Sequence, residues 1–206
     1  MSTIALFGGS GRTGMRMLER LLEDGHHVRL LTRRPLQPRD GLDVIIGDAT
    51  DQEAVIETIQ RADVVMSALG TDKQNVLSRF TPLVIAAMQQ AGLKRILIVG
   101  TAGILRAHDS DNYRFETRES KRSMTTAAED HARAYELFEA SDLDYTIVCP
   151  TQLIEGESVG EIVITADVLG TLNSGPIARD DVAELMLRAW KDRTYIRHRV
   201  GITTES

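Results

Sequence analysis

Short apolar runs alternate with longer amphipathic stretches along most of this chain. The runs rich in Val, Ile and Leu predict β-strands at residues 3–8, 27–32, 43–48, 63–69, 95–100 and 144–150. Apolar residues at helical spacing predict helices at residues 12–24, 51–60, 75–91 and 125–141. Alternation of this kind is typical of a parallel sheet joined by crossover helices, so the predicted fold class is α/β.

Two segments depart from this rhythm. Residues 104–124 are polar and without a clear period, and a loop of that length is usually either the cover of a site or disordered. The tail, residues 151–206, predicts a strand at 161–165, a helix at 179–191 and a last strand at 199–203. We expect the tail to complete the sheet edge and wall a pocket within one domain spanning 1–206.

Composition and charge exclude several function classes. The net charge of −6 argues against a nucleic-acid partner. No apolar run approaches 18 residues and no leader precedes the first strand, so we expect no membrane segment and a cytoplasmic location. The single cysteine, Cys149, allows no disulfide within the chain, and no spacing of His, Cys, Asp or Glu predicts a metal site.

The clearest motif is the glycine-rich stretch GGSGRTG, which separates the first predicted strand from the first helix. In such a turn the first glycine allows the tight bend, the second lets the backbone approach a pyrophosphate, and the third lets helix and strand pack closely. The N–H groups at the helix start then face the anion. The predicted contacts in this stretch are Gly8, Ser10, Gly11, Arg12, Thr13 and Gly14.

Glycines in a turn also have two other interpretations. A nucleotide triphosphate loop needs Gly-Lys-Ser/Thr at its end, whereas Met15 and Arg16 follow Gly14 here. A purely structural turn remains the alternative to dinucleotide binding.

The end of the second predicted strand indicates which dinucleotide binds. An acidic residue at this position would bind the ribose 2′-hydroxyl of NAD, whereas arginine accommodates the 2′-phosphate of NADP. Arg33 and Arg34 occupy the position, and the first carboxylate after them is Asp40. With Arg12 nearby in the loop, the sequence predicts NADP(H) in preference to NAD(H). A solvated basic turn is the alternative.

Taken together, the motifs resemble the atypical short-chain dehydrogenases, in the group with NmrA-like proteins and the biliverdin reductase B (flavin reductase) type. The similar stretches are GGSGRTG (8–14), LLTRR (30–34), IIGDATD (45–51), MSALGT (66–71), IVGTAGI (98–104), EDHARAYELFEASDLDYTIVCPTQL (129–153) and GPIARDDVAELML (175–187). This resemblance implies a single doubly wound Rossmann domain with a parallel central sheet and a small C-terminal substrate lobe. The cofactor contacts it implies are Asp48 and Ala49 at the adenine, Ala68, Leu69 and Gly70 at the ribose and pyrophosphate, and Thr101 and Pro150 at the nicotinamide.

The sequence also departs from these relatives. No tyrosine has a lysine four residues later, which argues against ketone reduction by the usual tyrosine acid. Ala102 and Gln152 stand where the biliverdin and flavin reductase type has a serine and a histidine, which argues against biliverdin itself. An acceptor that takes up its proton from water needs no acid from the protein. The protein then only has to hold the acceptor against the nicotinamide.

We therefore expect an NADPH-dependent reductase of a conjugated small-molecule acceptor, such as a flavin, a quinone or a biliverdin-like compound. Thr101 would hydrogen-bond the substrate or the carboxamide and Gln152 would orient the acceptor; the alternative for both is a role as wall residues only. A non-catalytic NADP(H) sensor of the NmrA kind is the alternative, and a nucleotide-sugar epimerase fragment is a weaker one. A monomer and a homodimer both remain open.

Three further side chains were weighed. His131 is expected to be a packed or surface residue of its helix. His108 and Tyr113 would meet a substrate only if residues 104–124 fold over the nicotinamide.

Overall fold

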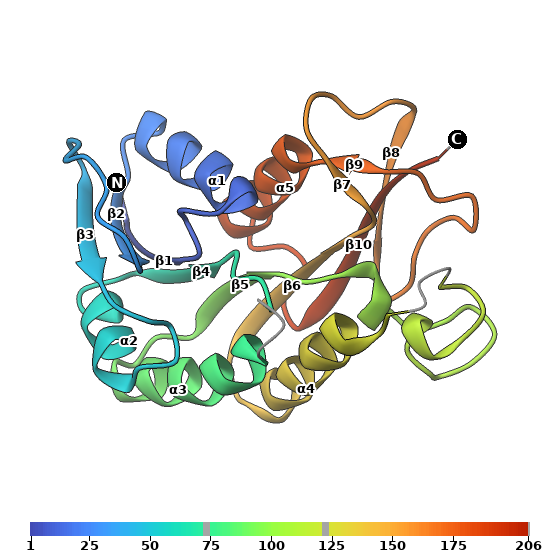
Figure 1. Cartoon of the computed structure of the whole chain (residues 1–206), viewed down its shortest axis with the longest axis horizontal. Helices are drawn as coiled ribbons and strands as arrows, with labels where there is room; N and C mark the ends of the chain where they lie inside the picture. The colour runs from blue at the N-terminus through green and yellow to red at the C-terminus, as the bar shows by residue number, and fades with distance from the viewer. Residues whose placement is uncertain (72–74, 121–123, 206) are drawn as a thin grey trace.

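A sheet of eight strands runs through the middle of the protein in a computed structural model that describes residues 1–71, 75–120 and 124–205 (Figure 1). The strand order is β3-β2-β1-β4-β5-β6-β10-β8, and neighbours are parallel except for β10 and β8. The bounds are β1 (Thr3–Phe7), β2 (His27–Thr32), β3 (Leu42–Ile46), β4 (Val64–Ser67), β5 (Arg95–Val99), β6 (Asp144–Pro150), β8 (Glu161–Ala166) and β10 (His198–Glu205). The predicted α/β class is thus confirmed.

Helices cover both faces of the sheet (Figure 1). One face carries α1 (Arg12–Glu23) and α5 (Arg179–Lys191), and the other carries α2 (Gln52–Ile59), α3 (Val76–Gln90) and α4 (Thr126–Ala140). On α1 the buried residues Gly14, Met17, Leu18 and Leu21 recur at spacings of three and four, which is the stripe that an amphipathic helix buries. No helix in the described part of the chain has the length and apolar character needed to cross a membrane.

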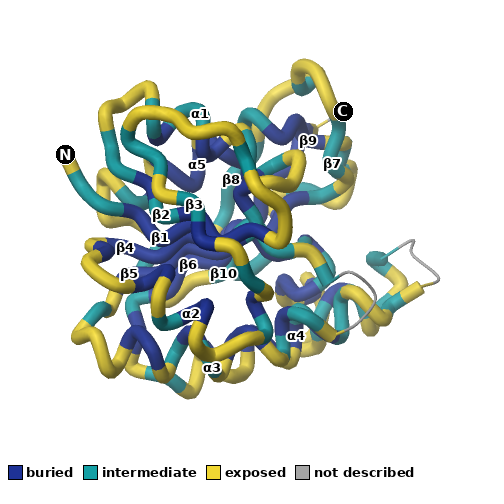
Figure 2. The backbone as a smooth tube through the Cα atoms, turned by 60° about the vertical axis from the view of Figure 1, so that its left-hand side comes forward, coloured by how far each residue is buried: buried dark blue, intermediate teal, exposed yellow. Residues whose placement is uncertain are grey.

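The sheet separates two hydrophobic cores because alternate strand residues point to opposite faces. Ile4 and Leu6 pack with the buried residues of α1 and α5, whereas Ala5 and Phe7 pack with those of α2, α3 and α4. Figure 2 shows the central strands buried between helices whose outer faces are exposed. Each fully buried large side chain, such as Phe7, stabilises the fold by about 1.5–3 kcal/mol.

The predicted strands and helices are confirmed in type, and their ends differ by up to two residues. The tail places β10 beside β6 and β8 at the sheet edge, with α5 at the predicted bounds. A second, two-stranded sheet of β7 (Leu153–Ile154) and β9 (Ile177–Ala178) was not predicted. Strands of two residues are too short to give a periodic signal.

Residues 104–120 are folded, although their sequence has no clear period. They include the end of the 3₁₀-helix η1 (Ala102–Ile104) and all of η2 (Arg114–Glu116). Ile104, Leu105 and Ala107 are buried, so three apolar side chains anchor an otherwise polar segment. Residues 121–123 of the segment for which a site cover and disorder were both left open lie outside the described residues.

Candidate functional site

The predicted site residues follow strands that end at one edge of the sheet. The carboxyl ends of parallel strands share an edge, and the strand order reverses between β1 and β4, where open α/β sheets bind ligands. Along this edge Gly8 follows β1, Arg33 and Arg34 follow β2, Asp48 and Ala49 follow β3, Ala68, Leu69 and Gly70 follow β4, Thr101 follows β5, and Pro150 ends β6.

The glycine loop leads from β1 into a helix whose start is not capped by a side chain. The N-cap of α1 is Gly11, whose N–H donates to the Gly8 carbonyl at 3.0 Å. At α2, in contrast, the Asp51 carboxylate accepts a hydrogen bond from the Glu53 N–H. The first-turn N–H groups of α1 therefore remain available to an anion.

Two glycines in this loop have no room for a side chain. A Cβ on Gly14 would lie 2.1 Å from the Gly8 carbonyl oxygen, and Gly8 itself has a φ of +76° with Ala68 at 2.6 Å from its Cβ position. The loop therefore packs backbone against backbone beside the uncapped helix start. This arrangement fits the pyrophosphate of a dinucleotide.

Three other loop residues surround this cradle. Ser10 and Arg12 are exposed and Thr13 is half-buried. The Arg12 guanidinium lies 3.8 Å from the carboxylate of Glu155, which follows β7. Glu155 is also 3.1 Å from the buried Arg179 at the start of α5, so this carboxylate links the glycine loop to the C-terminal part of the chain.

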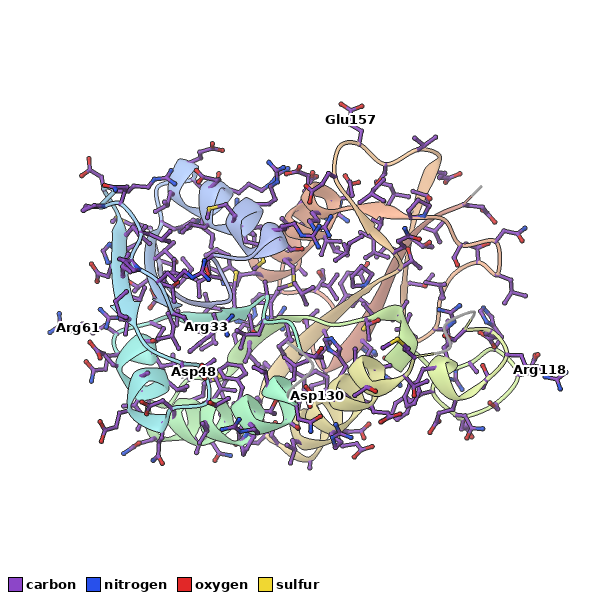
Figure 3. All side chains as sticks on the ribbon, viewed as in Figure 1. Arg33, Asp48, Arg61, Arg118, Asp130 and Glu157 are labelled. Carbon is purple, nitrogen blue, oxygen red and sulfur yellow. The ribbon has the colours of Figure 1, made fainter. Side chains whose placement is uncertain are left out.

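The two arginines predicted to select NADP lie at the carboxyl end of β2. Arg33 and Arg34 are exposed. The Thr32 hydroxyl accepts from the Arg34 N–H and donates to the Arg34 carbonyl, which shapes the turn. Figure 3 places Arg33 near Asp48. The pKa of Asp48 lies below its usual value mainly because of hydrogen bonds from Thr50, and the positive charge of Arg33 lowers it further.

A large cleft opens beyond the glycine loop. It has a volume of about 1010 Å³ and brings together four predicted residues, Gly70, Thr101, Pro150 and Gln152. Its other lining residues are Thr71, Gly100, Ala102, Gly103, Arg114, Phe115, Glu119, Ser120, Met124, Thr125, Ala127, Ala128, His131, Thr151, Leu153, Leu172, Asn173, Ser174, Gly175 and Pro176.

The two predicted catalytic residues line the cleft from different segments of the chain. Thr101 is the N-cap of η1, and its hydroxyl oxygen accepts a hydrogen bond from the Gly103 N–H at 3.4 Å. Gln152 is exposed, and its backbone carbonyl accepts from the Ile177 N–H, which joins β7 to β9. Both residues thus line a space large enough for a ring-shaped acceptor.

The polar segment supplies a wall of this cleft, but through residues that sequence analysis did not name. Arg114, Phe115, Glu119 and Ser120 line the cleft. His108 and Tyr113, which were considered as substrate contacts, are not among the lining residues. The His108 ring instead pairs with the Glu119 carboxylate at 3.0 Å.

Glu119 is the centre of this wall. Its carboxylate accepts from the His108 N–H at 2.7 Å and from the Arg114 side chain at 3.2 Å. Burial tends to raise the Glu119 pKa, but these hydrogen bonds outweigh burial and hold the pKa below its usual value. The buried Arg114 is thus matched by a charged partner within the segment.

His131 was also missed as a site residue. It lies on α4 and lines the cleft. Burial lowers its pKa to about 4, and the Asp130 charge opposes that shift only in part. The only signal in the sequence was a histidine on a helix, which is more often a packed residue. In the described ranges, no group of three or more His, Cys, Asp or Glu side chains could hold a metal ion.

Comparison with known proteins supports the geometry. A family model described as NAD(P)H-binding matches residues 8–193. Among solved structures, an anaerobilin reductase from Escherichia coli O157:H7 has 22% identity and a TM-score of 0.78, covering 98% of this chain and 96% of its own. A protein provisionally named NADH-flavin reductase from Streptococcus pneumoniae has 21% identity and a TM-score of 0.84, covering 100% of both chains.

A third structure was solved with a bound nucleotide. It is a short-chain dehydrogenase/reductase from Veillonella parvula in complex with NADP, with 17% identity, a TM-score of 0.77, and coverage of 98% of this chain and 94% of its own. At these identities the likeness concerns the fold. The expected relation to NAD(P)H-binding Rossmann proteins is thereby confirmed.

Proposed function

Because the chain belongs to the NAD(P)H-binding family, we propose that it is an NADPH-dependent reductase that passes hydride to a conjugated acceptor such as a flavin, a quinone or a biliverdin-like compound. The observation that carries this proposal is the cleft of about 1010 Å³, which adjoins the ends of β5 and β6 where the nicotinamide would lie. The reductases among the structural neighbours support the same reaction class.

The proposed cofactor contacts are those predicted from the sequence. The α1 start and Gly8 to Gly14 would hold the pyrophosphate, and Arg33 and Arg34 would bind the 2′-phosphate of NADPH. When bound, the cofactor supplies the hydride, and the protein holds the cofactor and the acceptor in position for the transfer. The single buried cysteine, Cys149, suits the reducing cytoplasm in which we place the protein.

At the acceptor end, Thr101 and Gln152 would orient the ring. No described tyrosine lies in the cleft lining, so the proposed reaction uses no tyrosine acid. Water would supply the proton that completes reduction. Holding the acceptor against the nicotinamide is then the main contribution of the protein to rate.

The test is NADPH oxidation with FMN, riboflavin, menadione and biliverdin in turn, followed by absorbance at the NADPH band. We expect turnover above the rate without protein for at least one acceptor, and a several-fold loss in Thr101→Val and Gln152→Leu. Tight NADPH binding without turnover of any acceptor would contradict the enzyme and favour the redox sensor. The absence of NADPH binding would contradict both.

A further inference from the structure

His131 separates two spaces of very different size. It lines both the large cleft and a small cavity. The small cavity is lined by Ser67, Leu77, Phe80, Thr81, Ile98, Ile104, His131, Ala134, Tyr135, Phe138 and Ile147. Among the described residues, none forms a hydrogen bond to the imidazole of His131, so its ring nitrogens are left for a ligand or for water.

The small cavity matches one water molecule in size. It has about 10 Å³ of space for the centre of a water molecule, which is near the minimum that one water needs. The Ser67 oxygen accepts from the Leu69 N–H at 3.5 Å, and the Thr81 hydroxyl donates to the Leu77 carbonyl at 2.8 Å. Both hydroxyl groups retain hydrogen-bonding capacity for a water that also bonds the imidazole.

Contacts of two neighbouring residues of α4, Asp130 and Ala128, fix the position of His131. The preceding residue, Asp130, is 1% exposed, and its carboxylate accepts from the N–H groups of Leu77 and Ser78 at 3.0 and 3.1 Å. One turn earlier, α4 packs on η1, because a Cβ on Gly103 would lie 3.2 Å from that of Ala128. These contacts hold His131 near η1, the 3₁₀-helix whose N-cap is Thr101.

The protonation state follows from the groups around the ring. Burial lowers the His131 pKa to about 4, and Asp130 on the same helix opposes this shift. Arg114 and Glu119, which also line the cleft, form an ion pair with each other, and Tyr135 lines the small cavity. The imidazole is thus neutral at pH 7, with one N–H donor and one acceptor nitrogen.

We propose that His131 is a further catalytic residue of the proposed reductase, whose neutral ring donates a hydrogen bond to the acceptor atom that becomes negative as hydride arrives. The inference rests on the proposed function. The C4–H bond of the reduced nicotinamide breaks, its hydrogen and two electrons form a new bond on the acceptor, and the nicotinamide becomes oxidised. Negative charge then falls on a conjugated carbonyl oxygen or ring nitrogen, where the imidazole N–H stabilises it until water supplies a proton.

This assignment narrows the substrate class. The acceptor must carry a carbonyl or imine group in conjugation with the hydride-accepting atom, so that its charge reaches the imidazole. A neutral donor also avoids the pH dependence that an acid would impose. Turnover should therefore not change with the titration of His131 between about pH 5.5 and 8.5.

The kinetic test compares His131→Phe, which removes the donor, with His131→Gln, which retains one. With the best acceptor, we expect kcat to fall about 10- to 100-fold in the phenylalanine variant, with a smaller loss in the glutamine variant and little change in KM. The matched control is His27→Gln at the amino end of β2, away from the cleft. Unchanged NADPH affinity would establish that the variants are folded. Equal kcat in wild type and both variants would overturn the proposal while leaving the proposed function standing.

A second readout does not depend on turnover. The imidazole ¹⁵N resonances of His131 are assigned by their loss in His131→Gln and followed with oxidised FMN and no NADPH. We expect a neutral ring down to pH 5 and a shift of the His131 signal on FMN addition. A ring that is protonated at pH 6.5, or one that does not respond at FMN concentrations above the KM, would overturn the proposal. If no acceptor is reduced, the proposed function fails, and the response to FMN alone decides whether His131 contacts an acceptor.

Discussion

The two ends of the candidate site are built in different ways. At the proposed cofactor end, the groups that would hold the pyrophosphate come from one turn of chain, residues 8–14, and most of them are backbone N–H groups. At the acceptor end, the walls of the cleft come from segments between residues 70 and 176. The first arrangement is fixed by local sequence, whereas the second exists only after the chain has folded.

The charges at the two ends differ as well. Arg33 and Arg34 are exposed on the surface at the end of β2, where a phosphate can reach them. Arg114 is buried in the cleft wall and paired with Glu119. Under the proposed function, arginine would recognise the ligand at one end, whereas at the other end it is part of the cleft wall.

The most severe test of the comparison is Gly14→Ala. Its Cβ would lie 2.1 Å from the Gly8 carbonyl oxygen, so the loop must open and the first-turn N–H groups lose their alignment. Loss of several bonds to a charged group predicts at least about 1000-fold weaker binding of NADPH and NADH alike. Titration calorimetry measures this. Gly92→Asn is the control, because that glycine has a positive φ but open space around it. Unchanged Kd values in Gly14→Ala would show that the loop is not the cradle.

A change at the other part of the cofactor end should separate the two nucleotides. Replacing Arg33 and Arg34 with alanine should weaken NADPH binding about 10- to 1000-fold and leave NADH binding nearly unchanged. Arg61→Ala is the control, since Arg61 points into solvent at the far side of α2 (Figure 3). Equal losses for both nucleotides would contradict the NADP preference.

The smallest effect is expected at the acceptor end. The folded-state pKa of Glu119 is depressed, so its contribution to stability is present above its ordinary value of 4.5 and is lost as pH falls through the lower folded value. Glu119→Gln should reduce the free energy of unfolding by about 1 kcal/mol at pH 7, with the difference shrinking below about pH 4.

Urea unfolding at a series of pH values measures this difference. Glu157→Gln serves as the control, because Glu157 projects into solvent (Figure 3). A difference between wild type and Glu119→Gln that stays constant down to pH 3 would mean that the carboxylate charge does not hold the wall.

The sequence predicts the fold well because each major element is specified by nearby residues. Met17, Leu18 and Leu21 mark the buried stripe of α1, and the alternation of Ile4 and Leu6 with Ala5 and Phe7 serves both faces of β1. The strands β7 and β9 pair across more than twenty residues and have two residues each, so no local pattern could predict them.

The site divides in the same way. The glycine loop and the arginines after β2 follow from spacing, because strand, turn and helix are consecutive. The roles of Glu119 and His131 depend on burial, which single-sequence patterns do not give at isolated polar positions. The lowered pKa of His131 comes from burial, which arises when α4 packs against α3 and η1.

The uncapped start of α1 has a consequence for the life of the protein in a cell. If the proposed site is correct, a bound nucleotide would satisfy N–H groups that no side chain caps, so occupancy should raise the melting temperature in proportion to the logarithm of free cofactor concentration. Chaperones and proteases act on the unfolded fraction, which shrinks as the cofactor pool fills. Steady-state abundance would then report the supply of reducing power, without any dedicated regulator.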